Sequence, residues 1–510
     1  MLMNPKLLTG KIRTLLLLTL LAITLSTSGA KVKNPGAGRC IYRYTLRDKA
    51  GGRHTLSEPW RFLSHRSLQR RERQGLSVDS TDLPVSPAYV RQFRTPQTEV
   101  IGTSRWHNTV LVLSADTAAL QRLSRLPMVV DARCVYVGPD SIDKPEDIRW
   151  TVREDFNKWD SVMNDPYGMG RPQVEMLRGE RLHDKGLRGS GMAIAVLDGG
   201  FRNYDRIPAL RSARIAGQHD FVPLSISRGD ISKNGLRDEE VLKAARRKAF
   251  HGIDHGTKVL SVLAAEAPEV LVGVATEATY WLLRCEDPLT EQPVEEDYWT
   301  LAAEYADSVG ADIISSSLGY YAYDDNRDSY RLQDLNGQTA LISRTASMLA
   351  SKGIVVCTSA GNAGMGQWKK IGVPGDATDV LTVGAIDKTE RIAAFSSVGP
   401  SQDLRVKPDV VALGAPTALL SGRGTLAHDM GTSFSTPLVS GLVACLWQGL
   451  PRLTAFEIID LVRRSANQYD EPTNILGYGI PDFWKAYLAG RGSDADTDAA
   501  RAEHAGDEGR

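Results

Sequence analysis

The strongest constraint on the fold is an alternation of short apolar segments with helical patterns between about residues 173 and 488. Parallel strands are buried and are joined by helical crossovers, so this alternation predicts an α/β domain with a mostly parallel central sheet. The predicted strands are Ala193–Leu197, Tyr280–Arg284, Ile313–Ser316, Ile354–Thr358, Leu381–Val383 and Val410–Leu413. The predicted helices are Lys258–Glu266, Tyr298–Ser308, Leu341–Ser351 and Ser435–Gln448.

A smaller α+β domain is predicted for residues 31–140. Its alternating apolar residues predict three strands, and two further segments have a helical pattern, the second with Ser114 as a candidate cap. The strands are expected at residues 41–46, 109–113 and 129–137, and the helices at 62–74 and 116–126.

The first of these helices is basic, with Arg66, Arg70, Arg71 and Arg73. So few basic residues on one helix favour a solvated face, or a surface that binds another domain, over a nucleic-acid site. The sequence alone does not decide between the first two readings.

Three further regions complete the chain. Residues 1–30 combine a positive start, an apolar run from Leu15 to Leu25 and small residues at 28–30, which predicts a secretion signal; an uncleaved membrane anchor is the alternative. Residues 141–172 are polar and irregular and are predicted to be an exposed linker. Residues 489–510 contain few apolar residues and are predicted to be a disordered polar tail.

Composition excludes some classes of protein. Lys plus Arg total 61 and Asp plus Glu total 61, so no net field favours nucleic acid or an anionic membrane. Five cysteines do not make a disulfide-rich scaffold. Cys285, Cys357 and Cys445 are expected in the core, whereas a disulfide between Cys40 and Cys134 is left open.

Three short motifs carry residues of nucleophilic catalysis. Asp198 ends a predicted strand, while His255 in His-Gly-Thr and Ser433 in Gly-Thr-Ser each begin a predicted helix. A serine hydroxyl needs an imidazole base, and the imidazole needs a carboxylate to orient it. In a parallel α/β sheet, strand ends and helix starts meet at one edge, so these three side chains are predicted to form a catalytic triad.

Each motif is weak alone, because strand-end Asp, His-Gly turns and Ser helix caps are common. Their order and context together are much more specific. Asn362 follows another predicted strand, and its amide could stabilise an oxyanion together with the Ser433 N–H. Taken by itself, Asn362 would be read as a turn residue.

These segments resemble the subtilisin-like (subtilase) serine peptidases over roughly residues 175–485. Further matching segments include Ser317-Leu318-Gly319, Ala360-Gly361-Asn362, residues 395–400 and residues 407–410. The resemblance implies a subtilisin-like three-layer domain, a triad of Asp198, His255 and Ser433, and Asn362 as oxyanion donor. It also implies that Ser317, Leu318 and Gly319 form an edge strand that pairs with a peptide substrate, with Ala360 and Gly361 also at the substrate site.

Residues 41–137 are similar to the inhibitory propeptides of this family, so the smaller domain is expected to be propeptide-like. The whole chain most resembles subtilases of Bacteroidetes-type bacteria, through residues 62–68 and 282–287. The resemblance implies an endopeptidase whose propeptide is removed on maturation. The predicted signal implies a secreted, periplasmic or cell-envelope location, and the maturation cleavage is expected within residues 138–175. Its expected partners are protein or peptide substrates and its own propeptide, with no nucleic acid and no membrane insertion once the signal is removed.

Some features depart from the family. Ala275-Thr276 and Ala412-Leu413-Gly414 replace usual family residues, and residues 228–248 are read as a surface insertion. Ala363 stands where some relatives have an acid, so an apolar or broad P1 preference is expected. No cofactor and no metal ligands are expected; calcium, which supports many family members, is left open because the sequence has no clear ligand cluster.

Other functions fit less well. His251 and His255 have the spacing of helical zinc ligands, but Gly252 replaces the required Glu. An α/β-hydrolase would need Gly-x-Ser-x-Gly and the order Ser, Asp, His. The remaining alternative is a catalytically silent or permanently propeptide-inhibited subtilase-fold binding protein.

Overall fold

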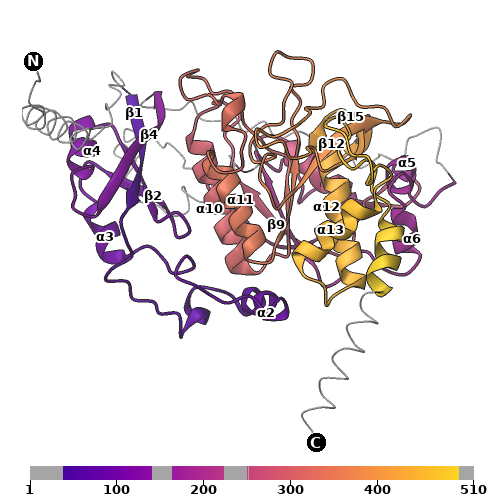
Figure 1. The fold of residues 1–510 in the computed structure, drawn as a ribbon, viewed down its shortest axis with the longest axis horizontal. Helices are drawn as coiled ribbons and strands as arrows, with labels where there is room; N and C mark the ends of the chain where they lie inside the picture. Colours follow the sequence, from indigo (N-terminus) through magenta and orange to yellow (C-terminus); the bar gives the residue numbers. More distant parts are fainter. Residues whose placement is uncertain (1–37, 140–163, 223–249, 251, 493–510) are drawn as a thin grey trace, which may run out of the picture.

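The computed structural model describes residues 38–139, 164–222, 250 and 252–492. A smaller N-terminal domain lies beside a larger domain that contains the rest of the described chain (Figure 1). The predicted secretion signal, the inserted segment 228–248 and His251 lie outside the described residues. Among the described residues, no helix is long and apolar enough to cross a membrane.

The N-terminal domain is built on a four-stranded antiparallel sheet in the order β2-β3-β1-β4. Tyr44, Phe93 and Leu120 are fully buried in its own small core. Its elements are β1 Gly38–Leu46, η1 Pro59–Arg61, α2 His65–Arg73, α3 Pro87–Gln92, β2 Glu99–Ser104, β3 Thr109–Ser114, α4 Thr117–Leu123 and β4 Val129–Pro139. The predicted Ser114 cap is wrong: Asp116 caps α4 by accepting a hydrogen bond from Ala119 N, because it stands directly before the helix.

The larger domain contains a seven-stranded sheet in the order β13-β12-β11-β10-β5-β9-β6. Every described pairing in this sheet is parallel, which confirms the predicted α/β fold. The strands are β5 Ala193–Asp198, β6 Arg214–Asp220, β9 Thr279–Arg284, β10 Ile313–Ser316, β11 Val355–Ser359, β12 Leu381–Asp387 and β13 Val410–Ala415. The helices are α5 Arg171–Glu175, α6 Gly179–His183, η2 Pro208–Leu210, α9 His255–Ala264, α10 Val294–Val309, η3 Leu332–Asp334, α11 Leu341–Ser351, α12 Thr432–Gly449 and α13 Ala455–Ser465. Two small hairpins add β7 Glu266–Ala267 with β8 Leu271–Val272, and β14 Thr417–Leu420 with β15 Leu426–Asp429.

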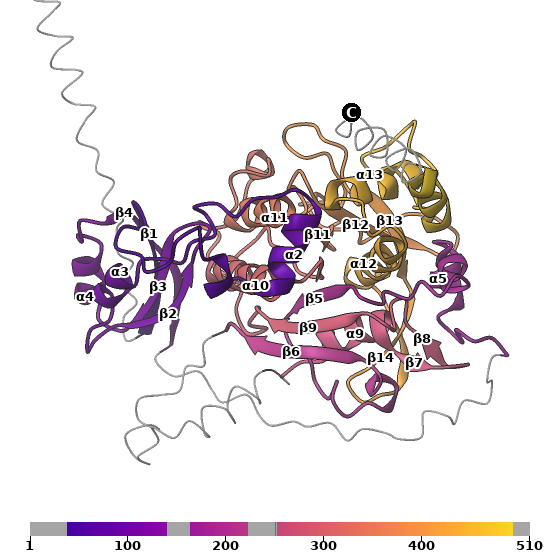
Figure 2. The same cartoon turned by 90° about the horizontal axis from the view of Figure 1, so that it is seen from below.

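Helices cover both faces of this sheet and give three layers (Figure 2). Side chains of a strand alternate between the two faces, so Ile194 and Val196 of β5 join the core under α9 and α12, while Ala195 and Leu197 join the core under α10 and α11. All strands are parallel, so their carboxyl ends lie along one edge. The predicted site residues lie along this edge.

Helix α2 does not pack on the sheet of its own domain but reaches across to the larger domain, beside α10 (Figures 1 and 2). Arg70 and Arg71 are fully buried there and both bind the Asp307 carboxylate of α10. Arg66 and Arg73 bind Asp312, just beyond the same helix. Of the two readings of the basic helix, the surface that binds another domain is therefore correct.

Two predicted boundaries differ from the structure. Tyr167 lies in the predicted linker but is buried in the core of the larger domain, and Met169 N donates to the Val270 carbonyl. Residues 483–492 are helical, so the predicted polar tail starts too early; Gly490 is buried beside Leu450. In both cases a few apolar or small residues within a polar stretch pack on the domain.

The three cysteines that were expected in the core are buried there. Cys285, Cys357 and Cys445 are fully buried. Cys40 and Cys134 lie on the adjacent strands β1 and β4, where the register pairs Cys40 with Val137 and Cys134 with Tyr42. Both are thiols in this structure.

Candidate active site

Asp198 and His255 form a direct pair at the carboxyl edge of the sheet. Asp198 is the last residue of β5 and is fully buried, and His255 is the first residue of α9. His255 Nδ1 lies 2.9 Å from each Asp198 carboxylate oxygen. This contact assigns the Nδ1 proton to the Asp198 side and leaves Nε2 for a reacting group.

The helix start that carries His255 is held close to the strand end. Gly256 N donates to the Gly200 carbonyl, and a Cβ on Gly256 would lie 2.6 Å from that same oxygen. A larger residue at position 256 would therefore push α9 away from β5. Glycine after His255 is what lets the imidazole reach Asp198.

Burial and the Asp198 carboxylate act in opposite directions on the proton affinity of His255. Burial lowers the pKa of His255, but the Asp198 carboxylate raises it by more, and the net pKa is about 9. Glu286 lies nearby and raises it further. An imidazole paired in this way is a stronger base than a free one.

Ser433 is the second residue of α12, after Gly431-Thr432. At this position a backbone N–H has no acceptor within its own helix. The Ser433 side chain is buried, and in the part of the chain that the structure describes Ser433 Oγ bonds the Ser317 carbonyl at 3.3 Å rather than His255. The His255 ring nevertheless lies 5.7 Å from the ring of Phe434, the residue that follows Ser433, so His255 faces the start of α12. Catalytic hydrogen bonds often tighten only when substrate binds.

Asn362 faces the start of the same helix. Its Oδ1 accepts hydrogen bonds from Thr432 N at 3.0 Å and Thr432 Oγ1 at 2.9 Å. With the carbonyl oxygen so occupied, the Nδ2 group is on the side of Gly431 and remains available as a donor. Gly361, at φ 103°, makes the turn that presents Asn362, which is exposed.

The other predicted substrate residues lie around Ser433. Ser317, Leu318 and Gly319 follow directly after the central strand β10, and Ser317 Oγ donates to the Ser433 carbonyl at 2.8 Å. Ala360 is buried and is bonded to Val383 and Gly372. Gly361 N donates to Thr432 Oγ1. The structure thus brings all nine predicted site residues to one region.

The predicted edge strand at Ser317–Gly319 is absent from the described structure, where β10 ends at Ser316. A strand needs a ladder partner, and no described backbone group bonds to the Gly319 N–H or carbonyl. The segment would become a strand only when another chain pairs with it.

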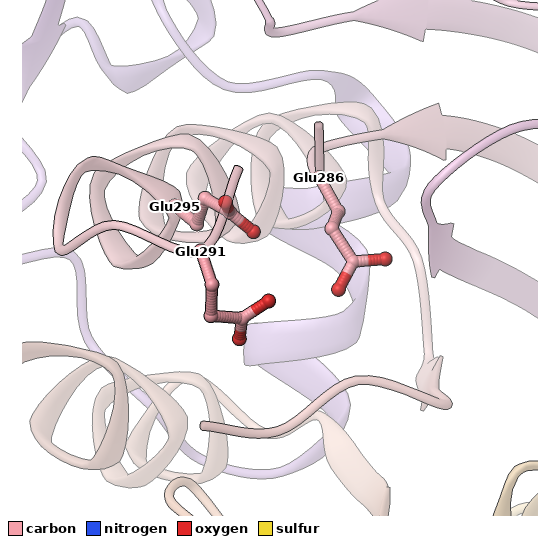
Figure 3. Close-up of side chains that lie close together, drawn as sticks. All are labelled: Glu286, Glu291 and Glu295. Atoms are coloured by element: carbon pink, nitrogen blue, oxygen red, sulfur yellow. The ribbon is translucent and has the colours of Figure 1, made fainter. Parts of the chain in front are cut away.

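Sequence reasoning missed an acidic cluster beside the site, formed by Glu286, Glu291 and Glu295 (Figure 3). A Cβ on Gly199, next to Asp198, would lie 2.8 Å from Glu286 Oε2. Burial, and then the charge of Asp198, raises the pKa of Glu286 to about 8. The available signal was the density of acids between residues 286 and 297.

Comparison with known proteins identifies two matched domains in the chain. The model of the subtilase family (peptidase S8) matches residues 189–479, and the model of the peptidase S8 propeptide domain of Bacteroidota matches residues 42–147. Subtilisin NAT of Bacillus subtilis subsp. natto is 27% identical over 318 residues, covering 62% of this chain and 69% of the relative. M-protease of Shouchella clausii is 25% identical over 350 residues, covering 68% and 76%. Serine protease AprX of Bacillus subtilis is 26% identical over 320 residues, covering 58% and 65%.

The fold and the matched domain define a serine-type peptidase. The chain belongs to the subtilase family and carries an N-terminal propeptide domain of the Bacteroidota type.

Proposed function

We propose that this chain is a secreted serine endopeptidase that hydrolyses peptide bonds in proteins through an acyl-enzyme on Ser433. The observation that carries the proposal is the bond between His255 Nδ1 and both oxygens of the buried Asp198, at 2.9 Å, beside the helix start that holds Ser433. This is the arrangement that turns a serine hydroxyl into a nucleophile.

In the proposed reaction, Ser433 Oγ attacks the scissile carbonyl carbon while His255 Nε2 takes its proton. Asp198 orients the imidazole and stabilises its charged form. Asn362 Nδ2 and the Ser433 N–H hold the oxyanion. His255 then returns the proton to the leaving amine, and water repeats the sequence on the acyl-enzyme. The substrate main chain pairs with Ser317–Gly319, where the backbone of Gly319 offers both a donor and an acceptor.

The N-terminal domain, about residues 31–140, is proposed to inhibit the peptidase domain until it is removed. Support comes from its buried contacts with α10 and from its last strand. Val137 N and O bond the side chain of Gln292, in the loop before α10, at 2.9 and 3.1 Å. The described N-terminal domain therefore ends at Pro139 next to the loop that carries the acidic cluster. Cleavage within residues 138–175 would separate the two domains.

The proposed peptidase domain extends from about residue 164, given the packing of Tyr167, to about residue 492. The secreted, periplasmic or cell-envelope location rests on the predicted signal in residues 1–30. The expected substrates are proteins and peptides.

A fluorophosphonate probe, which labels activated serines, tests the proposal. The samples are the parent chain, Ser433→Ala and Ser435→Ala, each before and after proteolytic removal of the N-terminal domain. Ser435 is a matched control because it lies in the same turn and its Oγ is buried; among the described residues this Oγ bonds only the Thr432 carbonyl. We expect labelling of the parent and Ser435→Ala but not of Ser433→Ala, and stronger labelling once the N-terminal domain is gone.

Cleavage of a peptide with both ends blocked would then distinguish an endopeptidase from an exopeptidase. A folded parent protein that is never labelled would refute the enzyme proposal and favour the binding-protein alternative. Labelling that never appears until the N-terminal domain is removed would show that this domain is an inhibitor.

A further inference from the structure

The three carboxylates of the acidic cluster lie close together, and they do not satisfy one another's hydrogen-bonding capacity. Glu286 follows β9, Glu291 lies in the loop, and Glu295 is in the first turn of α10. One oxygen of each carboxylate lies within 4.8 Å of the others. The three carboxylates turn toward a common space (Figure 3).

Glu295 is the least satisfied member of the cluster. It is fully buried, and neither carboxylate oxygen has a hydrogen-bond partner among the described residues. Leaving a buried carboxylate without any partner is strongly unfavourable.

The surroundings supply no compensating positive group. No Lys or Arg in the described ranges forms an ion pair with any of the three glutamates, although most buried acids of α10 have partners. Within the described ranges the hydroxyl of Tyr320, which is 1% exposed, also lacks a hydrogen-bond partner, and Glu295 and Glu286 are the charges that act most strongly on it. Glu295 and Tyr320 are thus two buried side chains whose polar atoms have no hydrogen-bond partner among the described residues, and the two interact electrostatically.

A shared proton does not explain the arrangement. Two carboxyl groups that share a proton approach to about 2.5–2.7 Å. Within the described part of the chain, no hydrogen bond joins any two of these glutamates. A basic side chain from a substrate would have to reach the fully buried Glu295, whereas a small ion needs only to contact it.

Oxygen donors of this kind select a hard cation. Calcium binds oxygen at about 2.3–2.6 Å, so two ligands on opposite sides of one ion are up to about 5 Å apart. Magnesium, at about 2.0–2.1 Å, allows only about 4.2 Å. The three carboxylate oxygens all lie within 4.8 Å of one another, which is inside the span that calcium allows. Half-buried Glu286 and Glu291 leave room for water, which calcium accepts in its six to eight positions.

We propose that Glu286, Glu291 and Glu295 bind one calcium ion, which fixes the segment between β9 and α10. This segment has a contact at each end that matters for function. Cys285 N donates to the Asp198 carbonyl at 3.0 Å, and Gln292 holds Val137 of the N-terminal domain. The ion would thus stabilise the backbone behind the Asp198–His255 pair and the surface that receives the N-terminal domain.

The test measures calcium binding directly on the full chain in a Ser433→Ala background, so that it does not depend on peptidase activity. After removal of divalent ions, calcium is titrated by calorimetry and thermal unfolding is followed with and without it. Glu291→Gln and Glu295→Gln remove ligands, and Asp287→Asn is the matched control, since it is an acid of the same loop outside the cluster. Both glutamate variants should fold, because glutamine removes a buried negative charge.

Even indirect partners of a metal contribute about 10–100-fold to affinity, so losing a ligand should weaken calcium binding by at least about tenfold. The parent and Asp287→Asn should show one site and a calcium-dependent rise in unfolding temperature. Calcium binding that is absent from the parent at millimolar concentration, or unchanged in both glutamate variants, would overturn the proposal. So would a parent that binds no calcium but binds a lysine or arginine peptide through these glutamates.

Discussion

Asp307 is the charge on which the contact between the two domains converges. It is fully buried on α10 and receives three guanidinium groups of the N-terminal domain: Arg70 at 2.5 Å, Arg71 at 2.9 Å and Arg105 at 2.5 Å. The change Asp307→Asn keeps the shape of the side chain and removes its charge. We expect it to weaken docking of the N-terminal domain severely.

The magnitude of this loss of docking free energy follows from the partners that Arg70 keeps when the charge of Asp307 is removed. Arg71 also binds Asp82, but the only other described acceptors within hydrogen-bond reach of the fully buried Arg70 are neutral: the Ser67 hydroxyl and the carbonyls of Ala311 and Lys352. Removing one partner of a buried ion pair costs about 3–5 kcal/mol, because the other charge is left uncompensated. This corresponds to a roughly 150- to 5000-fold loss in the docking equilibrium. The separated peptidase domain no longer contains these three arginines, so the change leaves no buried guanidinium without a partner there. Its unfolding free energy should therefore change by less than about 1 kcal/mol.

Hydrogen exchange of the full chain, in a Ser433→Ala background, measures this opening in α2, residues 65–73. The control is Glu58→Gln, which breaks the exposed pair between Arg61 and Glu58, whose side chains are 56% and 39% exposed. Such a pair contributes about 0–1 kcal/mol, so exchange in the control should rise by less than about fivefold. An equally small rise in Asp307→Asn, or an equal loss of stability in the separated peptidase domain, would refute the reasoning.

Three further predictions concern the site and its regulation. Asn362→Ala should lower kcat by about 10²–10³ with little change in KM, a size of effect taken from a subtilisin rather than from this chain; an unchanged kcat would remove Asn362 from the oxyanion site. His255 acts as a base only when neutral and its pKa is raised to about 9, so kcat/KM of the mature enzyme should keep rising with pH above the ordinary histidine value of about 6.5; a profile already level at about pH 6.5 would contradict this. His107 of the N-terminal domain bonds Thr345 of α11 in the larger domain. Burial, and then the charges of Arg344 and Arg43, lowers the pKa of His107 to about 3, whereas in the separated domain it should be about 6.5. The separated form therefore gains a proton first, and docking should weaken as pH falls below about 6.5. The check is gel filtration at about pH 5 and about pH 8 after cleavage between the domains. At the lower pH, less of the N-terminal domain should dissociate from the peptidase domain in His107→Gln than in the parent.

The sequence predicts strands well where both faces are buried and poorly at edges. Strands β5, β9 and β10 are mostly buried and each contains an apolar segment, and they were predicted almost to the residue. Strand β6 was missed because it is the last strand of the sheet and is mostly exposed, so its composition carries little signal. Strand β2 is also an edge strand, is largely half-exposed and has an irregular register.

For the site, the sequence predicts residue types but not distances. Asp198 and His255 are 57 positions apart, and their contact depends on β5 lying in the middle of the sheet with α9 on one face. The resemblance to subtilases supplied that arrangement, which spacing alone could not. The direction of the Ser433 hydroxyl, toward Ser317 rather than His255, could not be foreseen because it depends on a single side-chain torsion.

The acids near the start of α10 show why a run of charge cannot be interpreted without the fold. Consecutive helical residues point about 100° apart, so Glu295, Glu296 and Asp297 meet three different environments. Asp297 binds Arg43 of the N-terminal domain, Glu296 accepts bonds from Tyr323 and Tyr330, and Glu295 turns into the acidic cluster.

Farther along the same helix, Asp307 receives the arginines of α2 and Arg105. One rigid helix therefore carries Glu295, one of the three proposed calcium ligands, at one end and the main docking charge at the other. Because a helix moves as a unit, an ion that fixes its first turn also fixes the position of Asp307. Calcium should consequently strengthen docking of the N-terminal domain as well as order the loop beside Asp198.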